Sequence, residues 1–418
     1  MIASAIIRLT KIRAAPALVL RALIVGLNFT VMLALAALLG LDVFGGLIML
    51  WGATLIAATL ISVGGPLCLL AGATRGAGLP VGDILRHMLI IPAFACLICG
   101  VLLMPLWPGL PWMVILMTAF GVNLLTCLAS LMRGLGSLHL SMALRDAGPA
   151  LALLCAALGV ASGEAEAILI RAAICMGILA ALAVIWCLRH PGCTAFLRHK
   201  TQGAIPSVAM WGTAVLGMGV AQVDIIIGGA FLTPEQIGLY AVLRRVANLV
   251  ALPVSVATWV SAGPVSEAYT QRDPEALRQA SLNGSLIAVV PGVVLFALGC
   301  AMIPALPWLT PAGTGGLTFA ILLWGALGQV IFASGFTVAT LCGLPHFAAA
   351  ARMISMLVYL AATGLAGTML SPALNAAAYV AGISFGSIML WQMLRQRLAL
   401  DTSAALLLRG KEGGWKLS

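Results

Sequence analysis

The sequence predicts an all-α polytopic membrane protein with about twelve transmembrane helices in two six-helix lobes. Three observations support this prediction. Of the 418 residues, 62% are hydrophobic and only 8% are charged, whereas about 25% are charged in an ordinary soluble domain. The mean hydropathy is +1.13. Apolar stretches of about 20 residues, enough to cross a bilayer as a helix, recur along the whole chain. A water-soluble enzyme is therefore excluded.

Cutting the sequence at charges, prolines and glycines separates the apolar runs into spans. A bilayer-spanning β-barrel would instead alternate polar and apolar residues in segments of about 10 residues, and runs such as 115–131 and 282–298 do not alternate. Helices are therefore expected. The expected spans cover residues 15–39, 44–70, 88–106, 112–132, 143–160, 166–188, 207–231, 237–260, 282–302, 317–342, 352–370 and 373–394.

Positive charge alternates from loop to loop along the chain. Most of the 22 lysines and arginines lie at the termini or in every second loop, and none lies in the loops around residues 42, 108, 164, 234, 311 and 371. Lysine and arginine mark cytoplasmic loops because they resist translocation. Both termini are therefore expected in the cytoplasm. The formal net charge of +10 then reflects topology and attraction to anionic lipid rather than nucleic-acid binding.

Two short sequence echoes divide the chain into halves. Segments 39–46 and 232–239 open the second and eighth spans, and in both an acidic residue precedes a glycine by three positions. The loops 133–136 and 342–345 are also similar. Because the two halves enter the membrane from the same side, any substrate site is expected between them. The predicted parts are an N-terminal six-helix lobe at 1–200, a C-terminal six-helix lobe at 201–394 and a basic cytoplasmic tail at 395–418.

The segment around the eighth span resembles a known family. Residues 224–240, continued through 244–248 and 252–264, are similar to the central segment of bacterial polysaccharide (O-antigen type) flippases. The cytoplasmic stretch 269–277 and the loop 131–136 are similar too. This family belongs to the multidrug/oligosaccharidyl-lipid/polysaccharide exporter superfamily. The superfamily also contains multidrug and toxin extrusion (MATE) antiporters and the lipid II flippase, which usually has two further helices.

The resemblance implies a MATE-like, two-lobed transporter that alternates access across the bacterial inner membrane. Its implied substrate is a lipid-linked (polyprenyl diphosphate) oligosaccharide used for polysaccharide biosynthesis and export. Membrane lipids, a polysaccharide polymerase and a chain-length regulator are the further partners that it suggests. No cofactor and no nucleic acid are expected.

Arginines inside the spans are the candidates for binding such an anion. At about 100° per residue, Tyr240, Arg244 and Asn248 share one face of the eighth span, and a charge there usually faces a water-filled cavity or reaches to the interface. A planar guanidinium can meet the paired oxygens of a diphosphate bidentately. Arg21 and Asn28 likewise share a face of the first span. We therefore expect these five residues to line a substrate cavity. For Arg21 a second position is equally open, because it lies close enough to the cytoplasmic end to reach the interface.

Asp224 is the acidic residue deepest within a span. Two interpretations are open, because buried carboxylates in transporters often bind a proton or cation that drives the cycle, while others form an ion pair with an arginine. Weaker polar stripes are expected at contacts between helices, and they comprise Asn123, Cys127 and Ser130; Arg352, Tyr359 and Thr363; and Asn375, Tyr379, Gly382 and Gly386.

Two other functions are weighed against the flippase. A MATE-type drug/cation antiporter would favour acidic residues in the cavity, whereas arginine is more frequent in these spans. An integral-membrane glycosyltransferase or polymerase would need catalytic groups on a large outward loop, and the predicted outer loops are short. Phosphate-binding glycine loops of the Walker type are absent from the sequence. No metal site is expected, because the cysteines lie in apolar runs and the histidines in or beside cytoplasmic loops.

Overall fold

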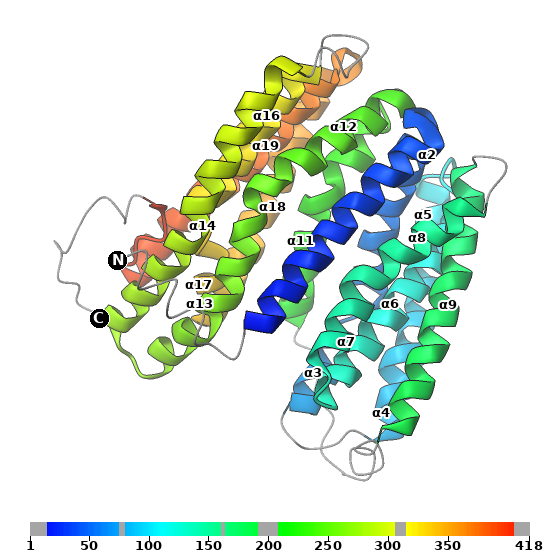
Figure 1. Ribbon diagram of the computed structural model, residues 1–418, viewed down its shortest axis with the longest axis horizontal. Coiled ribbons are helices and arrows are strands. Elements are labelled where there is room, and N and C mark those ends of the chain that lie inside the picture. The colour runs from blue at the N-terminus through cyan, green and yellow to red at the C-terminus, as the bar shows by residue number, and fades with distance from the viewer. Residues whose placement is uncertain (1–14, 75–79, 160–163, 191–207, 306–314, 405–418) are drawn as a thin grey trace. The chain divides into compact units, whose positions relative to one another are not determined.

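The computed structural model describes residues 15–74, 80–159, 164–190, 208–305 and 315–404, and all regular secondary structure within these residues is helical. The chain divides into two compact units, Met1–Trp211 and Gly212–Ser418, which we call the N-terminal and C-terminal units (Figure 1). The predicted boundary at residues 200 and 201 lies outside the described residues, so the predicted division into lobes stays a prediction.

The N-terminal unit is a helical bundle built around α6. Among the candidate membrane spans of the described residues, α6 is the most deeply buried, at 67% of its apolar segment. It packs against α2, α3, α5 and α9. The helices of this unit are α2 (Ala15–Ile61), α3 (Gly65–Thr74), α4 (Val81–Leu85), η1 (Arg86–Ile90), α5 (Ile91–Leu106), α6 (Trp112–Gly134), α7 (Leu138–Met142), η2 (Ala143–Ala147), α8 (Gly148–Leu158) and α9 (Ala165–Arg189).

The C-terminal unit is a second helical bundle. Its closest pairs of helices are α13 with α14 and α18 with α19. The first helix is α11 (Val208–Gly228), whose first four residues fall on the N-terminal side of the division. The others are α12 (Pro234–Ala247), η3 (Asn248–Ala251), α13 (Leu252–Thr270), α14 (Pro274–Met302), η4 (Ile303–Ala305), α16 (Gly315–Ile331), α17 (Gly335–Leu341), α18 (Pro345–Ala366), η5 (Gly367–Met369) and α19 (Pro372–Leu398).

The number of spans differs from the number predicted. Ten helices in the described residues are long and apolar enough to cross a membrane, or eleven if the bent pair α16 and α17 forms one span. The difference from about twelve arises at α2, which contains the first predicted span and most of the second. A straight helix of its 47 residues would extend about 70 Å, whereas the hydrocarbon core is about 30 Å thick. At Gly40 the backbone is non-helical, with φ 75° and ψ 159°, and glycine permits this kink because it lacks a Cβ.

Helix ends also differ from the predicted spans, because helices extend into polar sequence. The span predicted at 282–302 is α14, which begins at Pro274. Its first turns are stabilised by Asp273, whose Oδ1 accepts hydrogen bonds from the backbone N–H groups of Glu275 and Ala276 at 3.0 and 2.9 Å. Cutting at charged residues therefore removed helical turns that lie outside the apolar run.

The span predicted at 237–260 is not one uniform α-helix. It begins at Pro234 behind a capping box formed by Thr233 and Gln236, and it changes to a 3-10 turn at Asn248–Ala251 before α13. The backbone N–H of Asn248 still bonds to the carbonyl oxygen of Arg244, as in an α-helix. Because a 3-10 turn has three residues per turn instead of 3.6, the register of the predicted polar face changes after Asn248.

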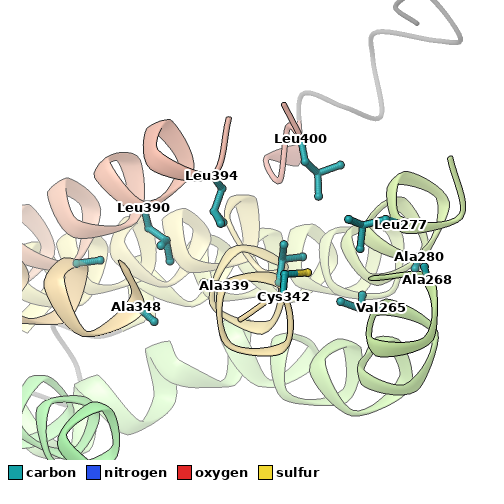
Figure 2. Close-up of a cluster of buried hydrophobic side chains, with 12 residues drawn as sticks. Val265, Ala268, Leu277, Ala280, Ala339, Cys342, Ala348, Leu390, Leu394 and Leu400 are labelled. Atoms are coloured by element: carbon teal, nitrogen blue, oxygen red, sulfur yellow. The ribbon is translucent and has the colours of Figure 1, made fainter. Parts of the chain in front are cut away.

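The residues after α19 fold back into the C-terminal unit. Leu400, Asp401, Thr402 and Ser403 are each no more than 5% exposed, and we call this segment the C-terminal clasp. Figure 2 shows Leu400 among the buried side chains of the core cluster, with Leu277 and Leu394 in the same cluster. The tail predicted at 395–418 thus begins within the last turn of α19, continues through the clasp, and from residue 405 lies outside the described residues.

The clasp is bonded to the break between α16 and α17, which are bent by 43°. Ser334, at this break, donates a hydrogen bond from Oγ to the carbonyl oxygen of Thr402 at 3.0 Å. Its Oγ also accepts hydrogen bonds from the hydroxyl groups of Ser281 and Ser285 on α14, at 3.1 and 3.4 Å. A hydroxyl group can donate one hydrogen bond and accept two, so Ser334 is fully bonded and joins α14, the break and the clasp.

Candidate functional site

A buried ion pair lies at the centre of the candidate site in the C-terminal unit. Asp224 is on α11 and Arg244 on α12, and Arg244 Nε lies 2.8 Å from Asp224 Oδ2. The two residues are 0% and 6% exposed. Taking two charges out of water is costly, so such a pair is stable only where further hydrogen bonds satisfy its remaining polar atoms.

Three groups supply most of those hydrogen bonds. The hydroxyl of Tyr240 donates to Asp224 Oδ2 at 2.6 Å. Arg244 Nη2 donates to the carbonyl oxygen of Ala221 at 2.8 Å and to the hydroxyl of Tyr379 at 3.0 Å. The guanidinium carbon also lies 4.7 Å from the centre of the Tyr379 ring, within the range of a cation–π interaction. Arg244 is therefore held by α11 and α19 as well as by its carboxylate partner.

A second set of hydrogen bonds fixes the backbone of α11 beside the pair. Asn375 Nδ2 donates to the backbone carbonyl oxygen of Asp224 at 3.0 Å, and the hydroxyl of Tyr359 donates to Asn375 Oδ1 at 2.8 Å. A Cβ added at Gly228 would lie 2.7 Å from Asn375 Nδ2, so glycine is needed for this approach. Together these contacts join α11, α12, α18 and α19. We call the six residues that make them the ion-pair cluster: Asp224, Tyr240, Arg244, Tyr359, Asn375 and Tyr379.

The two oxygens of the Asp224 carboxylate differ in their hydrogen bonding. Its Oδ1 is buried and has no hydrogen-bond partner among the described residues. A proton added to Oδ1 would displace none of the hydrogen bonds given above. The ion-pair cluster therefore has a position where the charge of Asp224 can be neutralised.

Solved structures of the same architecture identify the fold. No known family profile and no curated protein matches the sequence. One similar structure is the inward-facing conformation of a multidrug resistance MATE family transporter of the MOP superfamily, with a TM-score of 0.66, 13% identity, and 93% of this chain and 96% of that chain covered. The chain has a MATE-like fold.

Two further structures share this MATE-like fold. A MATE structure in the bent conformation has a TM-score of 0.62 at 15% identity and covers 97% of this chain and 96% of its own. The lipid II flippase MurJ in an inward closed conformation has a TM-score of 0.60 at 13% identity and covers 95% and 93%. The three structures are thus a multidrug resistance transporter, a MATE protein and a lipid II flippase. At such low identity the likeness establishes the fold and does not carry over a substrate.

Within the MATE-like fold, the sequence-predicted residues fall into two groups. The ion-pair cluster contains three of them, Asp224, Tyr240 and Arg244. Asp224 forms an ion pair with an arginine, which was one of the two interpretations open for this residue. Asn248 is half-buried at the start of η3 and is not among the polar partners of the pair in the described residues. That these residues bind substrate, or that Asp224 couples transport to an ion, stays a prediction.

Arg21 and Asn28 lie on α2 in the N-terminal unit. Arg21 Nη1 is 3.6 Å from Asp146 Oδ2, and Asn28 Nδ2 donates to the backbone carbonyl oxygen of Asp146 at 2.9 Å. Both side chains reach Asp146, as residues on one helix face would. Sequence reasoning did not single out Asp146, although an acidic residue directly after Arg145, within a predicted span, was a signal that could have found it.

The residues that complete the ion-pair cluster were predicted only as weak polar stripes. Tyr359, Asn375 and Tyr379 are 1%, 0% and 7% exposed. Their spacing of four residues from Asn375 to Tyr379 places both on one face of α19. That signal was visible in the sequence, but it did not indicate which helix this face contacts.

Proposed function

We propose that this chain is an alternating-access transporter that moves a lipid-linked oligosaccharide, carried on a polyprenyl diphosphate, across the bacterial inner membrane for polysaccharide biosynthesis. The MATE-like fold supports the transport part of this proposal, since the matching structures include multidrug transporters and a lipid II flippase. The resemblance of residues 224–240 to polysaccharide flippases supports the substrate class.

The observation that carries the proposal is the buried guanidinium of Arg244. It is a fixed positive charge inside a membrane helix bundle, and its counter-charge is a single carboxylate. A diphosphate offers paired oxygens with the same geometry as a carboxylate, with more negative charge. The diphosphate can therefore replace Asp224 as the partner of Arg244, whereas an uncharged sugar cannot.

This exchange of partners would couple binding to protonation. When the diphosphate takes the guanidinium, the carboxylate of Asp224 is left in a buried place without its positive partner, which favours its neutral form. A proton from solvent would then bind to Oδ1, the oxygen without a hydrogen-bond partner in the described residues. When the diphosphate leaves, the proton would leave too and the ion pair would form again.

The experiment compares polysaccharide export by Arg244→Ala, Arg244→Lys and Arg245→Ala in cells at matched protein levels. Arg245 is the control, because it is the neighbouring arginine on the same helix and, among the described residues, forms no salt bridge with Asp224, whose charge it senses only at longer range. We expect Arg244→Ala to abolish export, Arg244→Lys to leave a small fraction, because lysine keeps the charge and loses the bidentate geometry, and Arg245→Ala to export normally. Wild-type export by Arg244→Ala would refute the proposal.

A drug/cation antiporter is the second candidate function. The specific observation in its favour is the buried carboxylate of Asp224, for which a cationic substrate would compete with Arg244. In that case Arg244→Ala would keep or increase drug efflux, and Asp224→Asn would lose it. Measuring the drug susceptibility of strains that carry Arg244→Ala or Asp224→Asn therefore separates the two functions.

A further inference from the structure

A second arginine of the C-terminal unit, Arg352 on α18, differs from Arg244 in its charge partners. Among the described residues, Arg352 forms no ion pair with an acidic side chain, whereas Arg244 is paired with Asp224. It lies about 10 Å along the helix from the first residue, Pro345. Because α18 is long and apolar enough to cross a membrane, a charge at this position is costly. Charges of this kind often mark the path of a substrate or ion.

Neutral groups from two neighbouring helices hold the guanidinium of Arg352. Its Nη1 donates a hydrogen bond to the backbone carbonyl oxygen of Thr213 on α11 at 2.5 Å. The guanidinium carbon lies 5.0 Å from the centre of the Phe336 ring on α17. A Cβ added at Gly217 on α11 would lie 2.7 Å from Nη1, so glycine permits this close approach. These contacts orient the side chain and leave its positive charge uncompensated.

Most of the hydrogen-bonding capacity of Arg352 is not used within the described residues. A guanidinium has five N–H donors in a planar fork, and the contact with the carbonyl oxygen of Thr213 uses one of its nitrogens. Arg352 is partly exposed, and neither Nε nor Nη2 is a buried atom that lacks a partner. Nε and Nη2 can therefore donate to a ligand. Two such adjacent donors match a phosphate group, which a guanidinium binds through paired hydrogen bonds.

Arg352 and Arg244 bind to the same face of α11. Arg352 donates to the carbonyl oxygen of Thr213, and Arg244 donates to that of Ala221. Positions eight apart share one face of a helix, and these two lie about 12 Å apart along it. One face of α11 therefore carries two guanidinium groups in succession, and only the second has a carboxylate partner among the described residues.

We propose that Arg352 is a second binding group for the transported substrate, which holds the diphosphate before it reaches Arg244. The inference rests on the proposed function, because it takes a polyprenyl diphosphate as the substrate. Thr213 is nearer than Ala221 to the start of α11, and the topology predicted from positive charge places that start on the cytoplasmic side. A substrate that comes from the cytoplasm therefore meets Arg352 first.

The difference in charge partners supports the same order. A diphosphate can bind to Arg352 without separating an ion pair of the described residues, whereas at Arg244 it must replace Asp224. Binding at Arg352 is therefore the less costly first step. It brings the diphosphate to within about 12 Å of Arg244 along α11.

The test is native mass spectrometry of the purified full-length protein with undecaprenyl diphosphate, which carries the diphosphate and a polyprenyl tail. Phosphatidylglycerol and inorganic diphosphate are the competitors. We expect Arg352→Gln to weaken binding of undecaprenyl diphosphate about tenfold, as for the loss of a hydrogen bond to a charged group. Arg352→Lys keeps the charge without the planar fork, so its binding should fall between those of Arg352→Gln and the wild type.

Matched variants separate the position of the guanidinium from charge and folding. Arg395→Gln also removes an arginine that lies over an aromatic ring, 5.6 Å from the centre of Trp391 on α19, and it should bind like the wild type. Gly217→Ala keeps the charge of Arg352 and displaces its guanidinium, so it should weaken binding, whereas Gly212→Ala meets nothing within 4 Å and should not. Because Arg352→Gln breaks no ion pair of the described residues, its melting temperature should not fall.

Three results would overturn the inference. The first is wild-type binding by Arg352→Gln. The second is displacement of undecaprenyl diphosphate by phosphatidylglycerol or inorganic diphosphate at lower concentration, which would indicate an ordinary lipid site or a small-anion site. The third is a lower melting temperature of Arg352→Gln together with wild-type binding by Gly217→Ala, which would indicate a structural role for Arg352.

Arg244→Ala distinguishes this inference from the proposed function. If Arg244→Ala loses binding and export while Arg352→Gln binds like the wild type, the inference fails and the proposed function stands. If the wild type does not bind undecaprenyl diphosphate, both fail.

Discussion

Asp224 and Arg244 depend on each other because both are buried. With exposures of 0% and 6%, each needs the other as a counter-charge, and Tyr240 and Tyr379 complete the hydrogen bonding. Buried pairs of this kind add little to stability compared with an apolar pair, but the loss of one partner leaves an uncompensated charge. This asymmetry gives the first prediction.

Replacing Asp224 by Asn should destabilise the protein by about 3–5 kcal/mol, because Arg244 stays charged and buried without its partner. The measurement is the free energy of unfolding of the purified protein in mild detergent. The double variant Asp224→Asn with Arg244→Gln should recover part of this loss, since it removes both charges. Additive losses in the double variant would contradict the direct interaction of the two side chains.

Gly228 tests the contact between α11 and α19. A Cβ at this position would lie 2.7 Å from Asn375 Nδ2, so Gly228→Ala must displace the amide that holds the Asp224 carbonyl group. We expect a loss of about 1–3 kcal/mol, as for other overpacked positions, together with reduced export. Gly212→Ala on the same helix is the control, because a Cβ there meets nothing within 4 Å; an equal loss in both variants would contradict the contact.

Among the elements, the bent pair α16 and α17 depends on a segment outside its own helices. A broken helix in a membrane leaves backbone groups that must be satisfied by the surrounding protein, and Ser334 lies at this break. The clasp reaches it because Asp401 Oδ1 accepts hydrogen bonds from Trp391 Nε1 at 2.8 Å and from the backbone N–H of Ser403 at 2.9 Å, which fix the turn after α19.

Removing the clasp should therefore loosen α17. A chain ending at Leu398 should show faster amide hydrogen exchange in Gly335–Leu341 than the wild type, by about tenfold for the loss of roughly one net hydrogen bond plus apolar contacts. A chain ending at Ala404 keeps the clasp and should exchange like the wild type. If both truncated chains exchange at the same rate, the clasp does not stabilise the break.

For the whole molecule, the positions of lysine and arginine predict a topology that the helices alone do not give. The MATE-like fold establishes a polytopic helical protein, while the side of the membrane on which each loop lies follows from the resistance of basic residues to translocation. Glu164 precedes α9 in a loop without lysine or arginine, and the chain after α19 is rich in them.

The topology can be tested with two reporter fusions in bacterial cells. A green fluorescent protein placed after residue 418 should fluoresce, because both termini are predicted to be cytoplasmic. Alkaline phosphatase inserted after Glu164 should be active, because it folds outside the cytoplasm. An inactive phosphatase at Glu164 together with a dark C-terminal fusion would reverse the predicted orientation.

The sequence by itself determined the helical membrane class and the approximate spans, and it singled out Asp224, Tyr240 and Arg244 as candidates, because hydropathy and helical period are properties of neighbouring residues. It did not predict that α2 continues through a kink at Gly40, nor that a 3-10 turn begins at Asn248. Both features depend on the local backbone conformation. Only the tertiary structure decided that Asn375 and Tyr379, more than a hundred positions along the chain from Asp224 and Arg244, complete the cluster. Packing between distant helices selects such partners, and no pattern of adjacent residues records which helix faces meet.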